Sequence, residues 1–230
     1  MWRSGGTLER SHKFGTAPPP RAGASYGNHL GHYEADARAY ARQLFGDLPP
    51  DEMLARLAGA LEGARVNVSV RRVGLFLAVE HPWFECYETS IRRDAGGGLY
   101  AYLHDVRKRG REPKNLAIRA FLRQVNAARA LGVKRFELYA AGDGNDTKFS
   151  GYRFWPRLGF NAQLSQSERE KLPPTLAQAG DLNQLMRLPD GYTWWKRFGR
   201  ERSMIFDLVE NSAMMQVFRQ HLKTVGLIEE

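Results

Sequence analysis

The spacing of apolar residues divides the chain into helical and extended segments. Apolar side chains three or four positions apart are typical of amphipathic helices, and this spacing covers residues 32–45, 51–61, 112–131 and 211–225. Alternating or short continuous apolar runs are typical of strands, and they cover residues 66–70, 74–79, 83–91, 99–106, 135–141 and 203–208. The chain therefore predicts two helices, a meander of three or four strands, a central helix and a further strand before its C-terminal part.

This order of elements predicts an α/β (α+β) fold with a mixed, mostly antiparallel sheet. The central helix crosses from the meander to the next strand, and extra helices follow towards the C-terminus. Helical and connecting segments interrupt the strands at about residues 165–200, where Trp194 and Trp195 predict a buried anchor. We expect a single domain over residues 32–230, ending in the helix at 211–225, and a Gly-, Ser- and Pro-containing irregular leader over residues 1–31.

The composition sets the size of the core and narrows the class of protein. A chain of 230 residues with 43% hydrophobic content builds one substantial domain. No apolar run reaches the length of a membrane span and no signal peptide opens the sequence, so we expect a cytoplasmic protein without a membrane partner. Cys86 is the sole cysteine, which excludes an internal disulfide and predicts no metal centre.

Positive charge gathers in the middle of the chain. Twelve Lys and Arg residues lie between Ile91 and Arg135 against three acidic residues, and this excess of nine equals the net charge of the whole chain, +9. Concentrated positive charge predicts an anionic partner, either a polyphosphate cofactor such as CoA or a nucleic acid such as RNA. The basic residues 107–111 enter the central helix. Because a helix N-terminus carries unpaired N–H groups and partial positive charge, this entrance suits a phosphate.

A run of residues after the strand at 135–141 carries a family pattern. Residues 151–160 read Gly-Tyr-Arg-Phe-Trp-Pro-Arg-Leu-Gly-Phe, and Leu131-Gly132 joins the central helix to that strand. The pattern resembles the GNAT N-acetyltransferase superfamily, in which Gly-Phe closes the acyl-CoA site after a helix, a Leu-Gly and a strand. It is also similar to the GNAT-type domains of phage and mobile-element proteins. The resemblance covers about residues 65–160, and the strand at 203–208 completes the sheet.

The resemblance implies an acyl-CoA cofactor, with acetyl-CoA as the expected form. In the family it lies in a cleft where the strand after the central helix splays from the strand before it. The pyrophosphate contacts are then expected from Val106, Arg107, Arg109, Gly110, Arg111, Lys114, Asn115, Leu116 and Ala117. The chain departs from the family pattern at two entrance glycines, which are Leu116 and Ile118 here, so that a Cβ narrows the approach. The basic entrance residues supply charge in place of close backbone contact.

Acyl transfer to an amine requires a base for the ammonium and an acid for the leaving thiolate. The family carries catalytic His residues on the strand that corresponds to residues 99–106, where His104 and Tyr102 share a face. Glu88, on the neighbouring strand, is the carboxylate alternative. The thiolate-side Tyr of the family corresponds to Trp155, which has no useful acid, so Tyr152, about one helical turn earlier, is the expected substitute.

Two classes of function follow from these features. The first is acyl transfer to an amine of a protein, a tRNA or a small molecule. An effector or toxin-type enzyme with an anionic substrate is one form of it. The second is a non-catalytic module of the same shape that binds nucleic acid or belongs to a phage structure. The basic clusters interleaved with aromatic residues favour this alternative.

Overall fold

The computed structural model describes residues 29–72, 74–110, 113–146 and 148–229. In this part of the chain, seven strands form one sheet in sequential order. They are β1 (His29–Tyr33), β2 (Arg65–Arg71), β3 (Gly74–Glu80), β4 (Phe84–Arg93), β5 (Leu99–Lys108), β6 (Arg135–Ala140) and β7 (Arg202–Asp207). The pairs β1–β2 and β5–β6 are parallel, and the other pairs are antiparallel. The predicted α+β class with a mixed, mostly antiparallel sheet is therefore confirmed.

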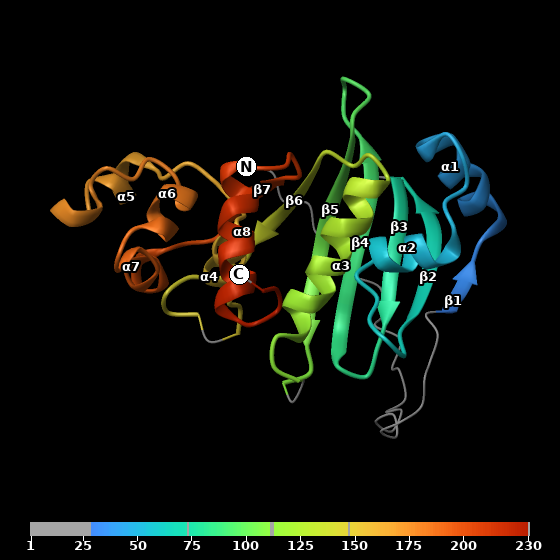
Figure 1. The fold of residues 1–230 in the computed structure, drawn as a ribbon, viewed down its shortest axis with the longest axis horizontal. Helices are drawn as coiled ribbons and strands as arrows, with labels where there is room; N and C mark the ends of the chain where they lie inside the picture. Colours follow the sequence, from blue (N-terminus) through green and yellow to red (C-terminus); the bar gives the residue numbers. More distant parts are fainter. Residues whose placement is uncertain (1–28, 73, 111–112, 147, 230) are drawn as a thin grey trace, which may run out of the picture.

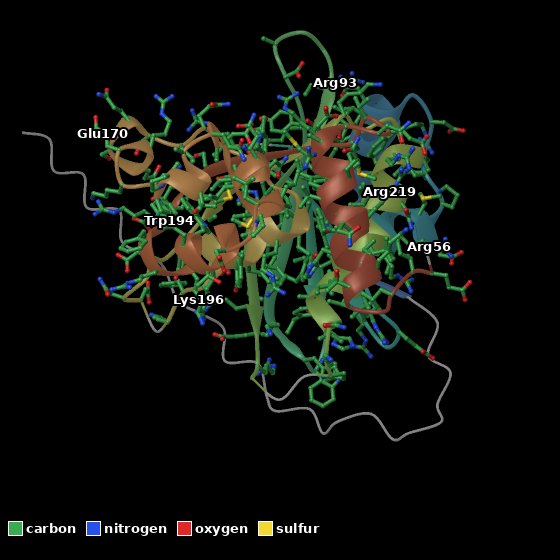
Figure 2. All side chains as sticks on the ribbon, turned by 60° about the vertical axis from the view of Figure 1, so that its left-hand side comes forward. Arg56, Arg93, Glu170, Trp194, Lys196 and Arg219 are labelled. Carbon is green, nitrogen blue, oxygen red and sulfur yellow. The ribbon has the colours of Figure 1, made fainter. Side chains whose placement is uncertain are left out.

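Four of the helices cover one face of this sheet. They are α1 (Ala35–Phe45), α2 (Asp51–Leu57), α3 (Leu116–Ala130) and α8 (Ala213–Thr224), all in front of the strands in Figure 1. Shorter helices follow β6, namely α4 (Gly151–Phe154), η1 (Trp155–Leu158), α5 (Gln166–Arg169), η2 (Pro174–Leu176), α6 (Leu182–Arg187) and α7 (Gly191–Phe198). They form the end of the molecule beyond β7, where Figure 2 labels Glu170, Trp194 and Lys196.

The alternation of side chains along β5 explains why the helices lie on one face. Leu99, Ala101 and Leu103 are buried beneath the helices, whereas Tyr100 and Tyr102 on the opposite face are only half-buried. Buried and more exposed side chains alternate in this way along a strand that has one face on the core and the other face in solvent. The face of the sheet away from α3, called the open face below, is therefore partly exposed among the described residues.

The C-terminal half packs around one aromatic cluster. The Phe121 ring of α3 lies 5.3–5.9 Å from the rings of Phe136, Trp155, Phe160, Phe206 and Phe218. Trp155 is 7% exposed, and Leu158 and Phe160 are fully buried. The predicted burial of Trp194 and Trp195 in the helical segment is confirmed as well.

Three predicted boundaries differ from the structure. The helix expected from His32 begins at Ala35, because residues 29–33 pair with β2 as strand β1. Residues 29–31, assigned to the leader, thus belong to the sheet, and the rest of the leader lies outside the described residues. The central helix expected from Glu112 begins at Leu116, since Asn115 has a left-handed backbone (φ 63°) that a helix cannot continue through. The second helix, expected to reach Leu61, ends at Leu57.

Candidate ligand-binding site

Strands β5 and β6 part at their carboxyl ends. Their parallel pairing joins residues 100–103 to residues 135–138, whereas β5 continues to Lys108. The end of β6 pairs with β7 instead, where Ala140 lies opposite Arg202. In open sheets, ligands bind outside the carboxyl ends of parallel strands at points where neighbouring strands separate. Helix α3 begins near this end of β5 (Figure 1), so its first turn is placed to meet such a ligand.

A first hollow, of about 330 Å³, opens at the start of α3. Its walls come from the end of β5, the start of α3, the α4–η1 segment and the end of α8. The lining residues are Lys108, Pro113, Lys114, Asn115, Leu116, Ala117, Ile118, Phe154, Arg157, His221 and Val225. Three of them are cationic, and no described Asp or Glu lines this hollow. An anion is the ligand that this combination of charges accepts.

The N-terminus of α3 presents its backbone to the first hollow. Asn115 stands at the N-cap, and no side chain caps the first turn. The Asn115 side chain is instead turned towards the C-terminal segment, where its Nδ2 donates a hydrogen bond to the Val225 carbonyl oxygen at 3.3 Å. The amide groups and partial positive charge of this 15-residue helix therefore add to the charge of the lysines.

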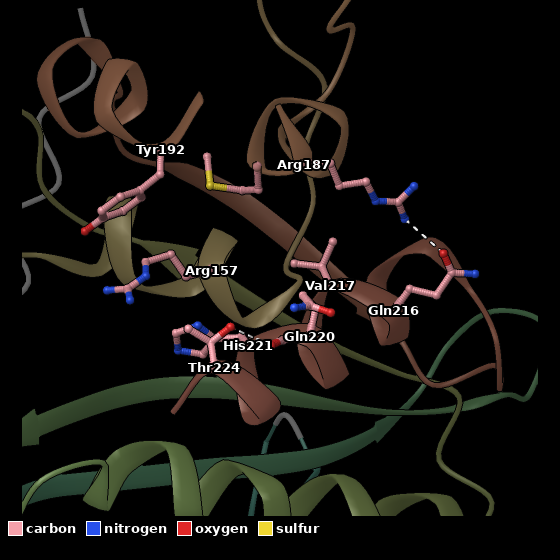
Figure 3. A pocket seen from close by; sticks show the side chains of 9 residues that line it. Arg157, Arg187, Tyr192, Gln216, Val217, Gln220, His221 and Thr224 are labelled. Carbon is pink, nitrogen blue, oxygen red and sulfur yellow. Dashed lines mark hydrogen bonds between the residues drawn. The ribbon is translucent and has the colours of Figure 1, made fainter. Parts of the chain in front are cut away.

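A second hollow, of about 510 Å³, adjoins the first and lies between α6, α7 and α8 (Figure 3). It is lined by Arg157, Met186, Arg187, Tyr192, Gln216, Val217, Gln220, His221 and Thr224. Arg157 and His221 line both hollows. Again, no acidic side chain of the described chain lies in the wall. The two hollows are therefore neighbours that share Arg157 and His221, and each has basic but no acidic side chains among its described lining residues.

His221 is neutral at physiological pH. Burial, and to a smaller extent the nearby Arg157 guanidinium, together lower the pKa of its imidazole to about 4. Both causes disfavour the charged form of histidine. The Arg157 guanidinium lies over the Tyr192 ring, 4.8 Å from its centroid. The positive charge between the two hollows is therefore that of Arg157, while His221 offers ring nitrogens without a charge.

The structure brings part of the predicted cofactor segment to the first hollow. Lys114, Asn115, Leu116 and Ala117 line it, and so does Ile118. The side chains that stand where the family has glycines are mostly buried, with Leu116 at 8% and Ile118 at 7% exposure. Although these two side chains replace glycines, a hollow of about 330 Å³ remains beside them.

The other predicted cofactor residues that the structure describes do not line either hollow. Val106 is half-buried in β5, and Arg107 pairs with Asp105 (2.8 Å) and Glu85 (3.0 Å). Arg109 donates from Nε to the Phe84 carbonyl oxygen at 3.2 Å, which extends the β4–β5 hairpin.

Gly110 has a left-handed backbone (φ 90°), and Arg111 lies outside the described residues. Arg107 and Arg109 are thus engaged by the β4–β5 hairpin, outside both hollows, and their contact with a cofactor stays a prediction.

Folding also pairs three arginines of the basic segment between Ile91 and Arg135, namely Arg107, Arg129 and Arg135, with acidic side chains. Arg135 forms ion pairs with Asp94 (2.7 Å) and Glu137 (2.6 Å), and Arg129 pairs with Glu210 (3.1 Å). Several of these acidic partners lie outside the segment in which the basic residues were counted. Within that segment, Lys108 and Lys114 are the basic residues that line the first hollow.

His104 and Tyr102 lie together on the open face. The rings are 4.9 Å apart, and Ser90 Oγ lies 2.8 Å from His104 Nε2 in hydrogen-bonding contact. The β4–β5 register shifts between Glu88 and Thr89, so that His104 is the extra residue of a β-bulge. Partial burial lowers the pKa of His104, and the charges of Arg92 and Arg71 lower it further. A neutral imidazole able to accept a proton therefore stands on this face.

Glu88 and Tyr152 are placed differently from His104. Glu88 is half-buried on β4 and lies opposite Asp105 of β5. Tyr152 is 2% exposed, and its hydroxyl donates to the Lys196 carbonyl oxygen at 2.7 Å. Burial raises the pKa of that hydroxyl. The structure thus commits Tyr152 to holding α4 against α7 and does not bring it to either hollow.

Arg157, Arg187, Tyr192 and His221 are the site residues that sequence reasoning missed. They come from η1, α6, α7 and α8, so no local spacing connects them. Arg157 alone carried a signal, because it belongs to the Trp-Pro-Arg-Leu-Gly-Phe run that was recognised for its family pattern.

Comparisons with known proteins identify no relative, so the geometry of the hollows is the main evidence on function. No protein-family model matches the chain, and no curated protein matches it significantly. Across residues 29–229, apart from the gaps given above, no helix has the length and apolar character needed to cross a membrane. The same residues contain no group of three or more His, Cys, Asp or Glu side chains arranged for a metal ion.

Proposed function

We propose that the chain is an acyl-CoA-dependent N-acyltransferase. The observation that carries the proposal is the first hollow, at the start of α3, which is lined by three cationic side chains and by no described acidic residue. Its chemistry fits the phosphates of CoA, since backbone amides of a helix N-terminus and flanking lysines are typical partners of a pyrophosphate. The position beside the parting ends of β5 and β6 agrees with where such sheets bind ligands.

The reacting groups meet at the parted strands in this proposal. Acyl-CoA supplies an activated acyl group, and a C–N bond to the amine replaces the C–S bond as the thiol leaves. Lys108, Lys114 and the first turn of α3 hold the phosphates on the helix-covered side. The acceptor approaches from the open face, where its ammonium first gives a proton to neutral His104; the free amine then attacks the thioester carbonyl, and the second N–H proton leaves with the thiolate as the thiol. Ser90 Oγ, 2.8 Å from His104 Nε2, orients the imidazole.

Binding is tested by isothermal titration calorimetry with acetyl-CoA and CoA. Lys114→Ala removes a cation from the first hollow, and we expect about a tenfold or greater loss of affinity, as for a hydrogen bond to a charged group. Arg119→Ala is the matched control, because Arg119 is exposed on α3 and lines neither hollow. The control removes the same unit of charge and should bind acetyl-CoA like the wild type.

Transfer is tested by release of the CoA thiol with a panel of primary amines that includes a lysine peptide, spermidine and tRNA. We expect thiol release that depends on one of these acceptors. Absence of any binding heat with millimolar acetyl-CoA, together with an unchanged melting temperature, would reject the proposal.

A second candidate function is the binding of single-stranded nucleic acid on the open face. There the Arg71 guanidinium lies 3.4 Å from the Phe76 ring centroid, and Arg92 lies 4.6 Å from that of Tyr102. Stacked arginine and aromatic side chains on a sheet are typical of such surfaces. Fluorescence anisotropy with a labelled oligo(U) separates the two functions. Loss of oligo(U) binding in Arg92→Ala, without any acetyl-CoA binding in the wild type, supports this candidate.

A further inference from the structure

The second hollow has the features of a nucleotide site. Helices α6 and α7 form one wall and α8 forms the other, and these elements lie outside the segments that carry the family resemblance (Figure 3). A volume of about 510 Å³ falls within the range of small-molecule pockets, about 300–1,000 Å³. The hollow is therefore large enough for more than an isolated anion.

Its walls combine two kinds of surface. Tyr192, Met186 and Val217 supply aromatic and apolar area against which a planar ring can pack. Arg157 supplies positive charge beside Tyr192, and Arg187 supplies it further along the hollow, with its guanidinium turned towards Gln216 in Figure 3. Arg187 is oriented by hydrogen bonds from its NH2 group to the Ala213 carbonyl oxygen (3.0 Å) and to Gln216 Oε1 (3.5 Å).

The polar neutral groups of the hollow suit the edge of a base. The Gln220 amide can both donate and accept hydrogen bonds, whereas the Gln216 amide already donates to the Asn211 carbonyl oxygen at 2.8 Å and accepts from Arg187. Thr224 Oγ1 donates to the Gln220 backbone carbonyl oxygen at 2.9 Å, so this hydroxyl is held within α8. Amide side chains of this type read the donor and acceptor pattern of nucleobases.

We propose that the second hollow binds a nucleoside phosphate, with the base against Tyr192 and the phosphate between Arg157 and Arg187. The proposal does not depend on acyl transfer. Because Arg157 and His221 line both hollows, the nucleotide can be the end of a larger cofactor whose other phosphates reach α3, or a free nucleotide. Both sources present the same chemistry to these residues.

The test is calorimetry on the full chain with three probes, namely 3′,5′-ADP, AMP and inorganic pyrophosphate. We expect 3′,5′-ADP to bind, and Arg187→Gln and Tyr192→Leu each to weaken it by about tenfold. Arg197→Gln is the matched control, since Arg197 is exposed on α7 and lines neither hollow. Circular dichroism melting of each variant establishes that it is folded. Tighter binding of 3′,5′-ADP than of AMP identifies the end of a CoA-type cofactor, and equal binding identifies a free nucleotide.

Several outcomes overturn the proposal. If pyrophosphate binds as tightly as 3′,5′-ADP and Tyr192→Leu changes nothing, the hollow is a plain anion site. If acetyl-CoA binds while 3′,5′-ADP does not, and Arg187→Gln leaves acetyl-CoA affinity unchanged, the nucleotide site is wrong and the acyltransferase proposal stands. If 3′,5′-ADP binds with the expected variant effects but acetyl-CoA yields no acceptor-dependent thiol release, the nucleotide site stands and acyl transfer is wrong.

Discussion

Replacing Gln124 by Leu tests how α3 is fixed to the sheet. The fully buried Gln124 amide accepts a hydrogen bond from the Tyr87 hydroxyl at 2.7 Å. Its Nε2 donates to the Leu57 carbonyl oxygen (2.9 Å) and to Thr89 Oγ1 (3.0 Å). One side chain thus ties α3 to β4 and to the end of α2, and it lies on the helix whose first turn lines the first hollow.

The expected loss in the free energy of unfolding follows from the polar groups that Gln124→Leu leaves without a hydrogen-bond partner. Leu has nearly the same size, so little packing is lost, but three buried polar groups lose a hydrogen bond at about 1–3 kcal/mol each. The apolar gain of Leu offsets part of this cost. We expect a net loss of about 3–5 kcal/mol in the free energy of unfolding. For a chain of this size, that corresponds to a fall of roughly 6–20 °C in melting temperature.

A double-mutant cycle with Tyr87→Phe measures the contribution of the hydrogen bond between Tyr87 and Gln124. In the wild type, Tyr87→Phe leaves Gln124 Oε1 without its donor and should cost about 1–2 kcal/mol. In the Gln124→Leu background the same change removes a hydroxyl that is already unpaired, so it should be neutral or stabilising. Urea unfolding followed by circular dichroism measures all four proteins.

Gln43→Leu is the matched control for this cycle, because Gln43 is exposed on α1, and it should stay within about 0.5 kcal/mol of the wild type. An equal cost of Tyr87→Phe in both backgrounds would show that the hydrogen bond does not stabilise the fold.

Three further predictions follow from the structure. Trp155→Ala should cost about 3–5 kcal/mol as a cavity substitution, measured by urea unfolding, and a normally melting variant would contradict its packing against Phe121. Because the folded-state pKa of His221 is about 4, below the usual 6.5, the unfolded chain takes up the proton first. Stability is thus fully present above pH 6.5 and lost as the pH falls towards 4. His221→Gln should show a smaller fall in melting temperature over this range, and an equal fall refutes the assignment. If acyl transfer occurs, His104→Ala should lower turnover by roughly a hundredfold or more while acetyl-CoA affinity stays unchanged. Full turnover in His104→Ala, with loss in Glu88→Gln, would move the base to the carboxylate.

The sequence predicts elements whose pattern is internal to a segment. Strand β5 and helix α3 appear in the spacing of their own apolar residues, so both were found. Strand β1 was missed because it contains few apolar residues and its extended form depends on pairing with β2. The start of α3 was placed too early, since apolar spacing does not reveal the left-handed backbone of Asn115.

The candidate site could be predicted only where its residues are close in sequence. Lys114 to Ala117 were expected at the ligand and do line the first hollow. Arg187 and His221 come from α6 and α8, and tertiary packing alone brings them to the second hollow. Tyr152 shows the opposite error, because its position in the family pattern suggested an exposed acid, whereas its hydroxyl holds the Lys196 carbonyl oxygen.

The source of the positive charge at the site differs from the one that the sequence suggests. Counting residues along one segment overlooks acidic partners from elsewhere in the chain, and Glu85, Glu137 and Glu210 each neutralise an arginine of the basic cluster. What distinguishes the hollows is the absence of acidic side chains from their described walls rather than a high density of basic ones. A cation that is paired with a carboxylate attracts an anionic ligand only weakly. Arg157 lines both hollows, and no described acidic side chain lines either of them, so its charge is available to such a ligand. We therefore expect an anionic ligand because the folded chain places no described acidic side chain in the walls of the hollows, a property that the sequence alone does not reveal.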